Sequence, residues 1–132
     1  AELAIVVNIS NPVDNLSLRD LIRIFKAERQ FWGGKPIHIL MHEEGSWEKE
    51  IILKKIYQMS GEELNKFWLG KVFRGEINNL PMIIGSANIL QKIIRQVPEA
   101  IGFIDASNIG EGLKVLKLEG RLPGDKEYLL HE

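Results

Sequence analysis

The sequence predicts an α/β domain with an open, mostly parallel sheet covered by helices on both faces. Two observations support this prediction. Short apolar runs rich in β-branched residues alternate with segments whose apolar residues recur at helical spacing. The chain has 132 residues, 45% of them hydrophobic and 27% charged, which suits one buried core. We therefore expect a single domain over residues 1–132.

The first part of the chain reads as strand, helix, strand. Residues 3–7 form an almost unbroken apolar run and predict a strand buried on both faces. Ser17 precedes apolar residues at positions i, i+3, i+4 and i+7, so a helix should begin there. Gly33 and Gly34 break this pattern, and residues 37–41 predict the second strand.

Two further helices are expected in the middle of the chain. One should run from Ser46 to about Tyr57. The next should begin at Ser60, because Glu63 completes a capping-box pattern ahead of an apolar stripe. Trp68 lies on that stripe, which predicts a core position for its side chain.

The last third repeats the alternation. Residues 80–84 predict a short strand, Ser86 should cap a fourth helix, and residues 101–104 predict another strand. Residues 113–118 partly alternate between apolar and polar, which is typical of a strand with one exposed face at the edge of a sheet.

Charge and composition exclude several classes of function. The net charge is −1 and the basic residues are scattered, so nucleic acid is not expected as a partner. No apolar run approaches the roughly 20 residues that span a bilayer. There are no cysteines, which excludes disulfides and thiolate ligands. The small residues at the start would fit either a removed signal peptide or an expression boundary.

Ligands of open parallel sheets gather where strand ends lead into helix starts. Three such junctions are visible, at residues 8–17, 42–47 and 85–88. Backbone N–H groups and helix dipoles there could hold a small oxyanion such as phosphate, and Gly45 would allow close approach. The alternative is that Ser46 and Ser86 are ordinary helix caps. Glu43, Glu44 and Glu48 surround the second junction and would repel an anion.

Metal and catalytic chemistry find little support. His42, Glu43 and Glu44 are adjacent, and adjacent residues rarely point to one metal ion; His38 falls in a predicted buried strand, where a core histidine is expected. The chain has no nucleophile elbow, P-loop or zinc-protease motif. We expect no enzyme activity, no metal and no cofactor. Trp47, beside the second junction, is the tryptophan expected to be exposed.

Several short motifs, in the same order along the chain, resemble the substrate-binding proteins of phosphate ABC importers. They are residues 6–13, Leu16-Ser17, Ile24-Phe25, Trp32, residues 34–37, Gly45-Ser46, residues 98–103, residues 116–120, Pro123 and residues 128–130. This resemblance implies one lobe of a type II periplasmic binding protein, similar to the second lobe of the family. It also implies a periplasmic or extracellular location and a phosphate-like ligand.

In that family the anion-binding turn has an arginine and, after two intervening residues, the run Gly-Ser-Gly-Thr. The matching positions here read His42, Gly45, Ser46, Trp47 and Glu48, so the glycine and serine carry over and the other three differ. The first hypothesis is therefore an oxyanion site, with the candidate residues Ser10, His42, Gly45, Ser46, Trp47 and Ser86. The second is a protein-interaction module that has lost the ligand and uses Trp47 and its acidic neighbours as an interface. A related alternative is a homodimer, in which a second copy covers the cleft-facing surface.

Overall fold

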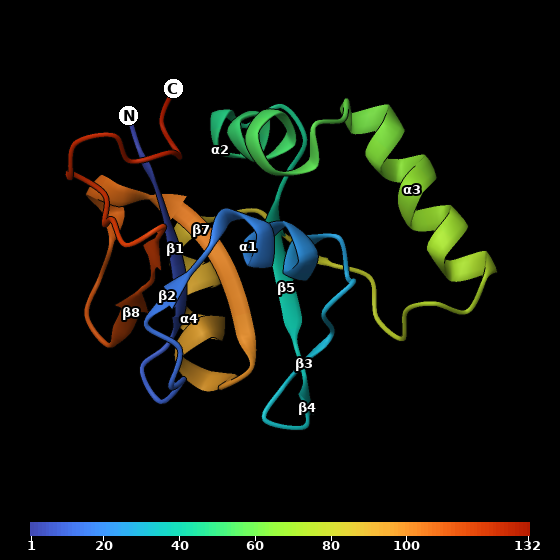
Figure 1. Cartoon of the computed structure of the whole chain (residues 1–132), viewed down its shortest axis with the longest axis horizontal. Coiled ribbons are helices and arrows are strands. Elements are labelled where there is room, and N and C mark those ends of the chain that lie inside the picture. The colour runs from blue at the N-terminus through green and yellow to red at the C-terminus, as the bar shows by residue number, and fades with distance from the viewer.

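The computed structural model describes all 132 residues and contains a central five-stranded sheet in the order β6-β5-β7-β1-β8 (Figure 1). These strands are β1 (Leu3–Asn8), β5 (His38–His42), β6 (Met82–Ile84), β7 (Ala100–Asp105) and β8 (Leu113–Val115). Strand β5 pairs parallel to β6 and β7, whereas β1 pairs antiparallel to β7 and β8. Four strands thus run in one direction and β1 alone is reversed, which confirms a mostly parallel sheet.

The reversal of β1 fixes which residues share an edge of the sheet. Leu3 lies opposite Asp105 and Val7 lies opposite Ile101, so β1 ends where β7 begins. All six residues of β1 are buried, as the apolar run predicted. An apolar run carries no information on strand direction, because both faces of a buried strand are covered whichever way it runs.

The predicted helices are present, and each begins after the expected serine. They are α1 (Leu18–Phe25), α2 (Trp47–Ile52), α3 (Gly61–Phe73) and α4 (Ala87–Gln96). Helix α2 continues into a π-helix over Leu53–Tyr57, so the helical segment ends at the residue that the sequence predicted. The side chain of each serine accepts a hydrogen bond from a backbone N–H of the first turn, and Ser60 forms the full capping box with Glu63.

Helices cover both faces of the sheet, as expected. Alternate side chains of β1 divide between two cores: Leu3, Ile5 and Val7 enter the larger one, while Ala4 and Val6 enter the smaller one. Helices α1, α2 and α3 contribute to the larger core, and α4 alone packs on the opposite face. In Figure 1, α4 lies behind the sheet and α1 in front of it.

Short elements complete the chain. The predicted strand at residues 113–118 divides into β8, at the expected edge of the sheet, and β9 (Lys117–Leu118), which pairs parallel to β2 (Asn15–Leu16). A small hairpin joins β3 (Phe31–Trp32) and β4 (Lys35–Pro36) around two glycines. A 3-10 turn at Ala106–Asn108 follows β7.

The two ends of the chain lie side by side. The backbone N–H of Glu132 donates to the carbonyl of Ala1 at 3.0 Å, and the Tyr128 hydroxyl donates to the Leu3 carbonyl at 2.6 Å. Figure 1 shows both ends at the top of the view, near α2.

Candidate functional site

Strands β5, β6 and β7 end at the same edge of the sheet. His42 at the end of β5 is in register with Ile84 at the end of β6, so the loops that lead to α2 and α4 lie next to each other. This arrangement brings together His42, Gly45, Ser46, Trp47 and Ser86, five of the six candidate residues. We call this the turn edge.

Ser10 does not join them. It follows β1, whose reversed direction places it at the opposite edge of the sheet. There the Asn8 side-chain amide donates to the Ile94 carbonyl at 2.8 Å, near the end of α4, and the Ser10 hydroxyl and backbone N–H donate to Asn8 Oδ1. The expectation of one shared edge for all three junctions is corrected, because it assumed that β1 runs parallel to β5.

The hydroxyls at the turn edge already have protein partners. Ser46 Oγ donates to the Glu43 carbonyl at 2.9 Å and accepts from the Lys49 backbone N–H at 3.2 Å. Ser86 Oγ accepts from the Ile89 backbone N–H at 3.1 Å. Both serines therefore act as helix caps. Gly45 has φ +88, a conformation that favours glycine, and no atom lies within 4 Å of the position of a Cβ there, so the backbone at this turn is open.

His42 takes part in the core. Its Nε2 lies 2.5 Å from the Phe103 carbonyl, and since a carbonyl can only accept, Nε2 carries the hydrogen. Its ring packs on the Phe103 ring at 4.7 Å between centroids, and Nδ1 lies 3.9 Å from Glu48 Oε2. The core histidine predicted at His38 is wrong, because His38 is exposed at the start of β5 and His42 is the buried one.

Carboxylates line the starts of two other helices at this edge. Glu43 Oε1 lies 3.0 Å from the position that a Cβ would take on Gly85, before α4, and Glu44 Oε1 lies 2.9 Å from that position on Gly61, at the start of α3. Neither carboxylate forms an ion pair with a lysine or arginine of the chain. Carboxylates near helix N-termini are stabilised by the positive end of the helix dipole, and these carboxylates make the turn edge negative.

Two further carboxylates at helix starts are held by hydrogen bonds within the chain. The Ser60 backbone N–H lowers the pKa of Glu63, and the Ser107 backbone N–H and hydroxyl lower the pKa of Asp105, at the end of β7. Both carboxylates are therefore ionised near neutral pH and add to the negative charge. No three potential metal ligands converge anywhere in the chain.

The burial of two tryptophans and one lysine could be predicted to different degrees. Trp68 is 8% exposed, which confirms its core position. The expectation that Trp47 is exposed is corrected, because Trp47 is half-buried and packs against the larger core. Lys49 is 8% exposed although lysines are mostly exposed, and it was not among the predicted site residues. A signal was available, because Lys49 precedes Ile52, Leu53 and Ile56 at the helical spacing of a buried stripe.

No protein-family model matches the sequence, and no curated protein matches it either. Solved structures do match. An ABC-type phosphate transport receptor from Vibrio cholerae has a TM-score of 0.75 at 22% identity, over 92% of this chain and 48% of that chain. A candidate phosphate ABC transporter substrate-binding protein from Clostridium perfringens, solved with bound phosphate, has a TM-score of 0.73 at 18% identity, over 90% and 45%. PstS from Borrelia burgdorferi has a TM-score of 0.70 at 18% identity, over 98% of this chain and 53% of that chain.

The fold is therefore that of one lobe of a periplasmic binding protein, and the resemblance inferred from short motifs is confirmed at the level of fold. The chain spans about half the length of these solved structures. None of its helices combines the length and apolar character needed to cross a bilayer.

Proposed function

We propose that this chain is a non-enzymatic recognition lobe of the solute-binding-protein type, acting in the periplasm or outside the cell. We further propose that its turn edge meets a basic protein surface rather than free phosphate. The observation that carries the proposal is the set of carboxylates at that edge, where Glu43 and Glu44 lie against the starts of α4 and α3 without a cationic partner.

The charges at the turn edge oppose an oxyanion. Like charges about 4 Å apart repel by about 1 to 4 kcal/mol at the dielectric of water or of a protein surface. A phosphate at this turn would lie near a chain segment in which Glu43 and Glu44 precede Gly45 and Glu48 follows it. His42 offers it no donor in place of the family's arginine, because Nε2 is bonded to the Phe103 carbonyl and Nδ1 faces Glu48. A cationic surface would gain from the same groups.

Oxyanion binding is the second candidate, and one observation favours it. The Gly45 backbone is unobstructed and α2 begins two residues after it, so a ligand could approach the backbone close to the positive end of a helix dipole. The Clostridium perfringens structure, which shares the lobe fold, holds phosphate.

Calorimetric titration with phosphate, sulfate and molybdate separates the two candidates. We expect no heat with millimolar ligand for the natural sequence. The variant His42→Arg/Trp47→Gly/Glu48→Thr restores the pattern of the phosphate-binding family at the turn and should gain measurable phosphate binding. Saturable binding by the natural sequence below about 0.1 mM, which corresponds to more than about 5 kcal/mol, would overturn the first proposal.

A photo-crosslinking residue tests the partner directly. Placed at Glu50, an exposed position in the first turn of α2, in cells of the natural host, it should capture one defined protein. The same residue at Ile9, which is 68% exposed and lies beyond the reversed end of β1, is the matched control. Capture at Glu50 should disappear in Glu43→Lys/Glu44→Lys. Equal capture at both positions, or capture that is indifferent to charge reversal, would contradict the proposal. Fractionation of the same cells checks the location.

A further inference from the structure

Helix α3 stands away from the edge strand β6 and leaves a groove between them. The groove has a volume of about 400 Å³, within the range of small-molecule sites. Its walls are mostly apolar and come from β5, β6, α3 and the segment before β6. The apolar lining residues are Met41, Leu64, Trp68, Leu69, Val72, Leu80, Pro81 and Ile83. We call this the α3 groove.

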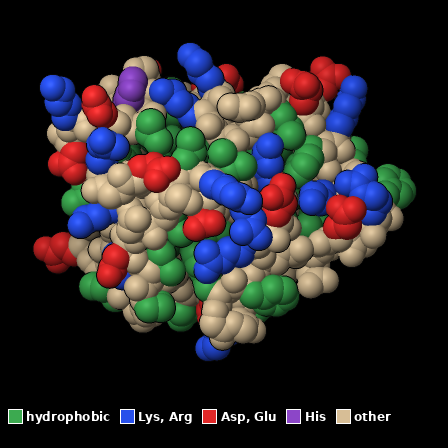
Figure 2. Space-filling view, in the orientation of Figure 1, with side chains coloured by type: hydrophobic (Ala, Val, Ile, Leu, Met, Phe, Trp, Pro, Cys, Tyr) green, Lys and Arg blue, Asp and Glu red, His purple; other side chains and the backbone are tan.

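Part of the apolar lining is open to solvent. Leu69 is 59% exposed, Val72 49% and Ile83 55%, although each belongs to a regular element. Figure 2 shows hydrophobic side chains reaching the surface on the α3 side of the molecule, at the right of the view. Such a surface favours an apolar occupant, because covering it removes hydrocarbon from water.

A single lysine belongs to this mostly apolar lining. Lys49 of α2 is only 8% exposed and lines the α3 groove beside Asn65. Its ammonium forms no ion pair and no hydrogen bond, and its only hydrogen bond to a side chain is made by the backbone N–H. The chain has no fully enclosed side-chain nitrogen or oxygen without a partner, so the unbonded Lys49 ammonium keeps contact with solvent at the end of an otherwise buried side chain. A lysine this deeply buried is normally paired.

We propose that the α3 groove binds a small amphipathic carboxylate, with the acid group on Lys49 Nζ and the hydrocarbon tail between α3 and β6. One ammonium matches one negative charge, and the Asn65 amide supplies a neutral donor nearby. Inorganic phosphate fits poorly, because it has no apolar part and carries more charge than one lysine balances. The groove is lined by side chains of the sheet face beneath α3, whereas the turn edge lies at the strand ends, so the two sites use different residues.

Octanoate titration followed by amide NMR tests this inference on the intact chain. We expect saturable shifts confined to α2, α3 and β6, around Lys49, Leu69 and Ile83. Octanol has the same tail without charge, and octylamine has the opposite charge. Both should bind at least about tenfold more weakly than octanoate, because a charge-assisted hydrogen bond stabilises only the carboxylate.

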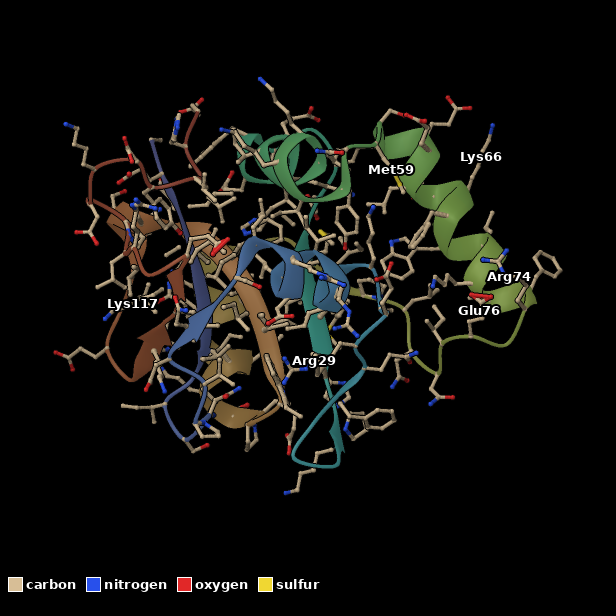
Figure 3. The ribbon with its side chains drawn as sticks, in the orientation of Figure 1. Arg29, Met59, Lys66, Arg74, Glu76 and Lys117 are labelled. Atoms are coloured by element: carbon tan, nitrogen blue, oxygen red, sulfur yellow. The ribbon has the colours of Figure 1, made fainter.

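Lys49→Met keeps the apolar stem and removes the charge. It should weaken octanoate binding about tenfold or more and leave octanol binding unchanged. Lys66→Met is the matched control, because Lys66 is 76% exposed, pairs with Glu62, and points away from the sheet in Figure 3. An unchanged amide spectrum outside the groove verifies that each variant is folded.

Three results would overturn the proposal. They are equal binding of octanoate and octanol, an undiminished octanoate affinity in Lys49→Met, and shifts that fail to saturate or that spread over the whole surface. Because the probes and variants leave the turn edge intact, failure here leaves the proposed function standing. Phosphate binding at the turn edge would likewise leave this inference standing.

Discussion

The interior of the central sheet and its β6 edge are built differently. Around β1 and β7 the side chains are fully enclosed: Phe103 and Phe25 are 0% exposed and Tyr57 is 1% exposed. Around β6 and α3 the apolar residues remain in contact with solvent, and Phe73 at the end of α3 is 87% exposed. Helix α3 contributes only Leu64 and Trp68 to the larger core.

This difference teaches where stability and recognition lie. Enclosed apolar surface stabilises the folded state, whereas exposed apolar surface contributes only when something else covers it. The β1–β7 region therefore holds the lobe together, whereas the β6–α3 region leaves apolar surface uncovered, where the ligand proposed above would lie.

Two phenylalanines should differ most. Phe103→Ala removes a ring that packs against Phe25 at 6.0 Å and His42 at 4.7 Å between centroids, so unfolding should become easier by about 3 to 5 kcal/mol. Phe73→Ala changes an exposed ring and should shift the free energy of unfolding by less than about 0.5 kcal/mol. Urea denaturation measures the free energy of unfolding of both variants. Comparable losses would mean that the β6–α3 region is as tightly packed as the β1–β7 region.

The buried tyrosine hydroxyls come next. Tyr57 OH donates to the Phe25 carbonyl at 2.7 Å, and Tyr57→Phe leaves that buried carbonyl without its partner, at a cost of about 1 to 2 kcal/mol. Burial also raises the pKa of Tyr57 and Tyr128 in the folded state. Stability is then fully present below the unfolded pKa of about 10, and it falls as the pH rises beyond that value because the unfolded chain releases protons first.

Denaturation curves between pH 8 and 11.5 check the direction of this pH dependence of stability. The natural sequence should lose stability above about pH 10, and Tyr57→Phe/Tyr128→Phe should flatten that loss. A double variant with the same alkaline decline as the natural sequence would show that other groups cause it.

Two serine caps make a matched pair across the comparison. Ser17→Ala removes the cap of α1, which is packed in the larger core, and should cost about 1 kcal/mol of global stability. Ser60→Ala removes a full capping box from α3, yet it should act locally and speed amide exchange in Gly61–Phe73 about fivefold. Hydrogen exchange of the backbone amides distinguishes global destabilisation from local opening of α3. Global destabilisation by Ser60→Ala would show that α3 unfolds together with the sheet.

The smallest effect is expected at the end of α3. Arg74 and Glu76 form an exposed ion pair at 2.6 Å, visible in Figure 3, which raises the pKa of Arg74 and lowers that of Glu76. Solvent screens such pairs, so Glu76→Gln should leave the denaturation midpoint unchanged within error at physiological salt. A clear shift would mean that this corner contributes to the fold.

The helices were predictable because their signals are local. Ser17, Ser46, Ser60 and Ser86 each begin the expected helix, since a cap needs only the residues that follow it in sequence. Strand positions were predictable for the same reason. The direction of β1 depends on pairing with β7, about a hundred residues away, and no local pattern records it.

The candidate site was only partly predictable, for related reasons. His42, Gly45, Ser46, Trp47 and Ser86 meet because β5 and β6 run parallel, as the alternating pattern indicated. Ser10 was misplaced because of β1. The core position was assigned to His38 although His42 is the buried histidine. The two residues are the first and last of β5, and strand ends are the least certain part of such a prediction. The bond from His42 to Phe103 joins two strands and leaves no trace in either segment alone.

The meeting of Ala1 and Glu132 has a topological consequence. Because these residues are hydrogen-bonded neighbours, the backbone would form a nearly closed loop, and only the short gap between Ala1 and Glu132, the seam, interrupts it. A few added residues could bridge the seam, and the ring could then be reopened between Gly33 and Gly34, in the turn of the β3–β4 hairpin. The same geometry would let the lobe be carried as an insert within another protein, whose flanking segments would need to separate by only the width of two adjacent chains.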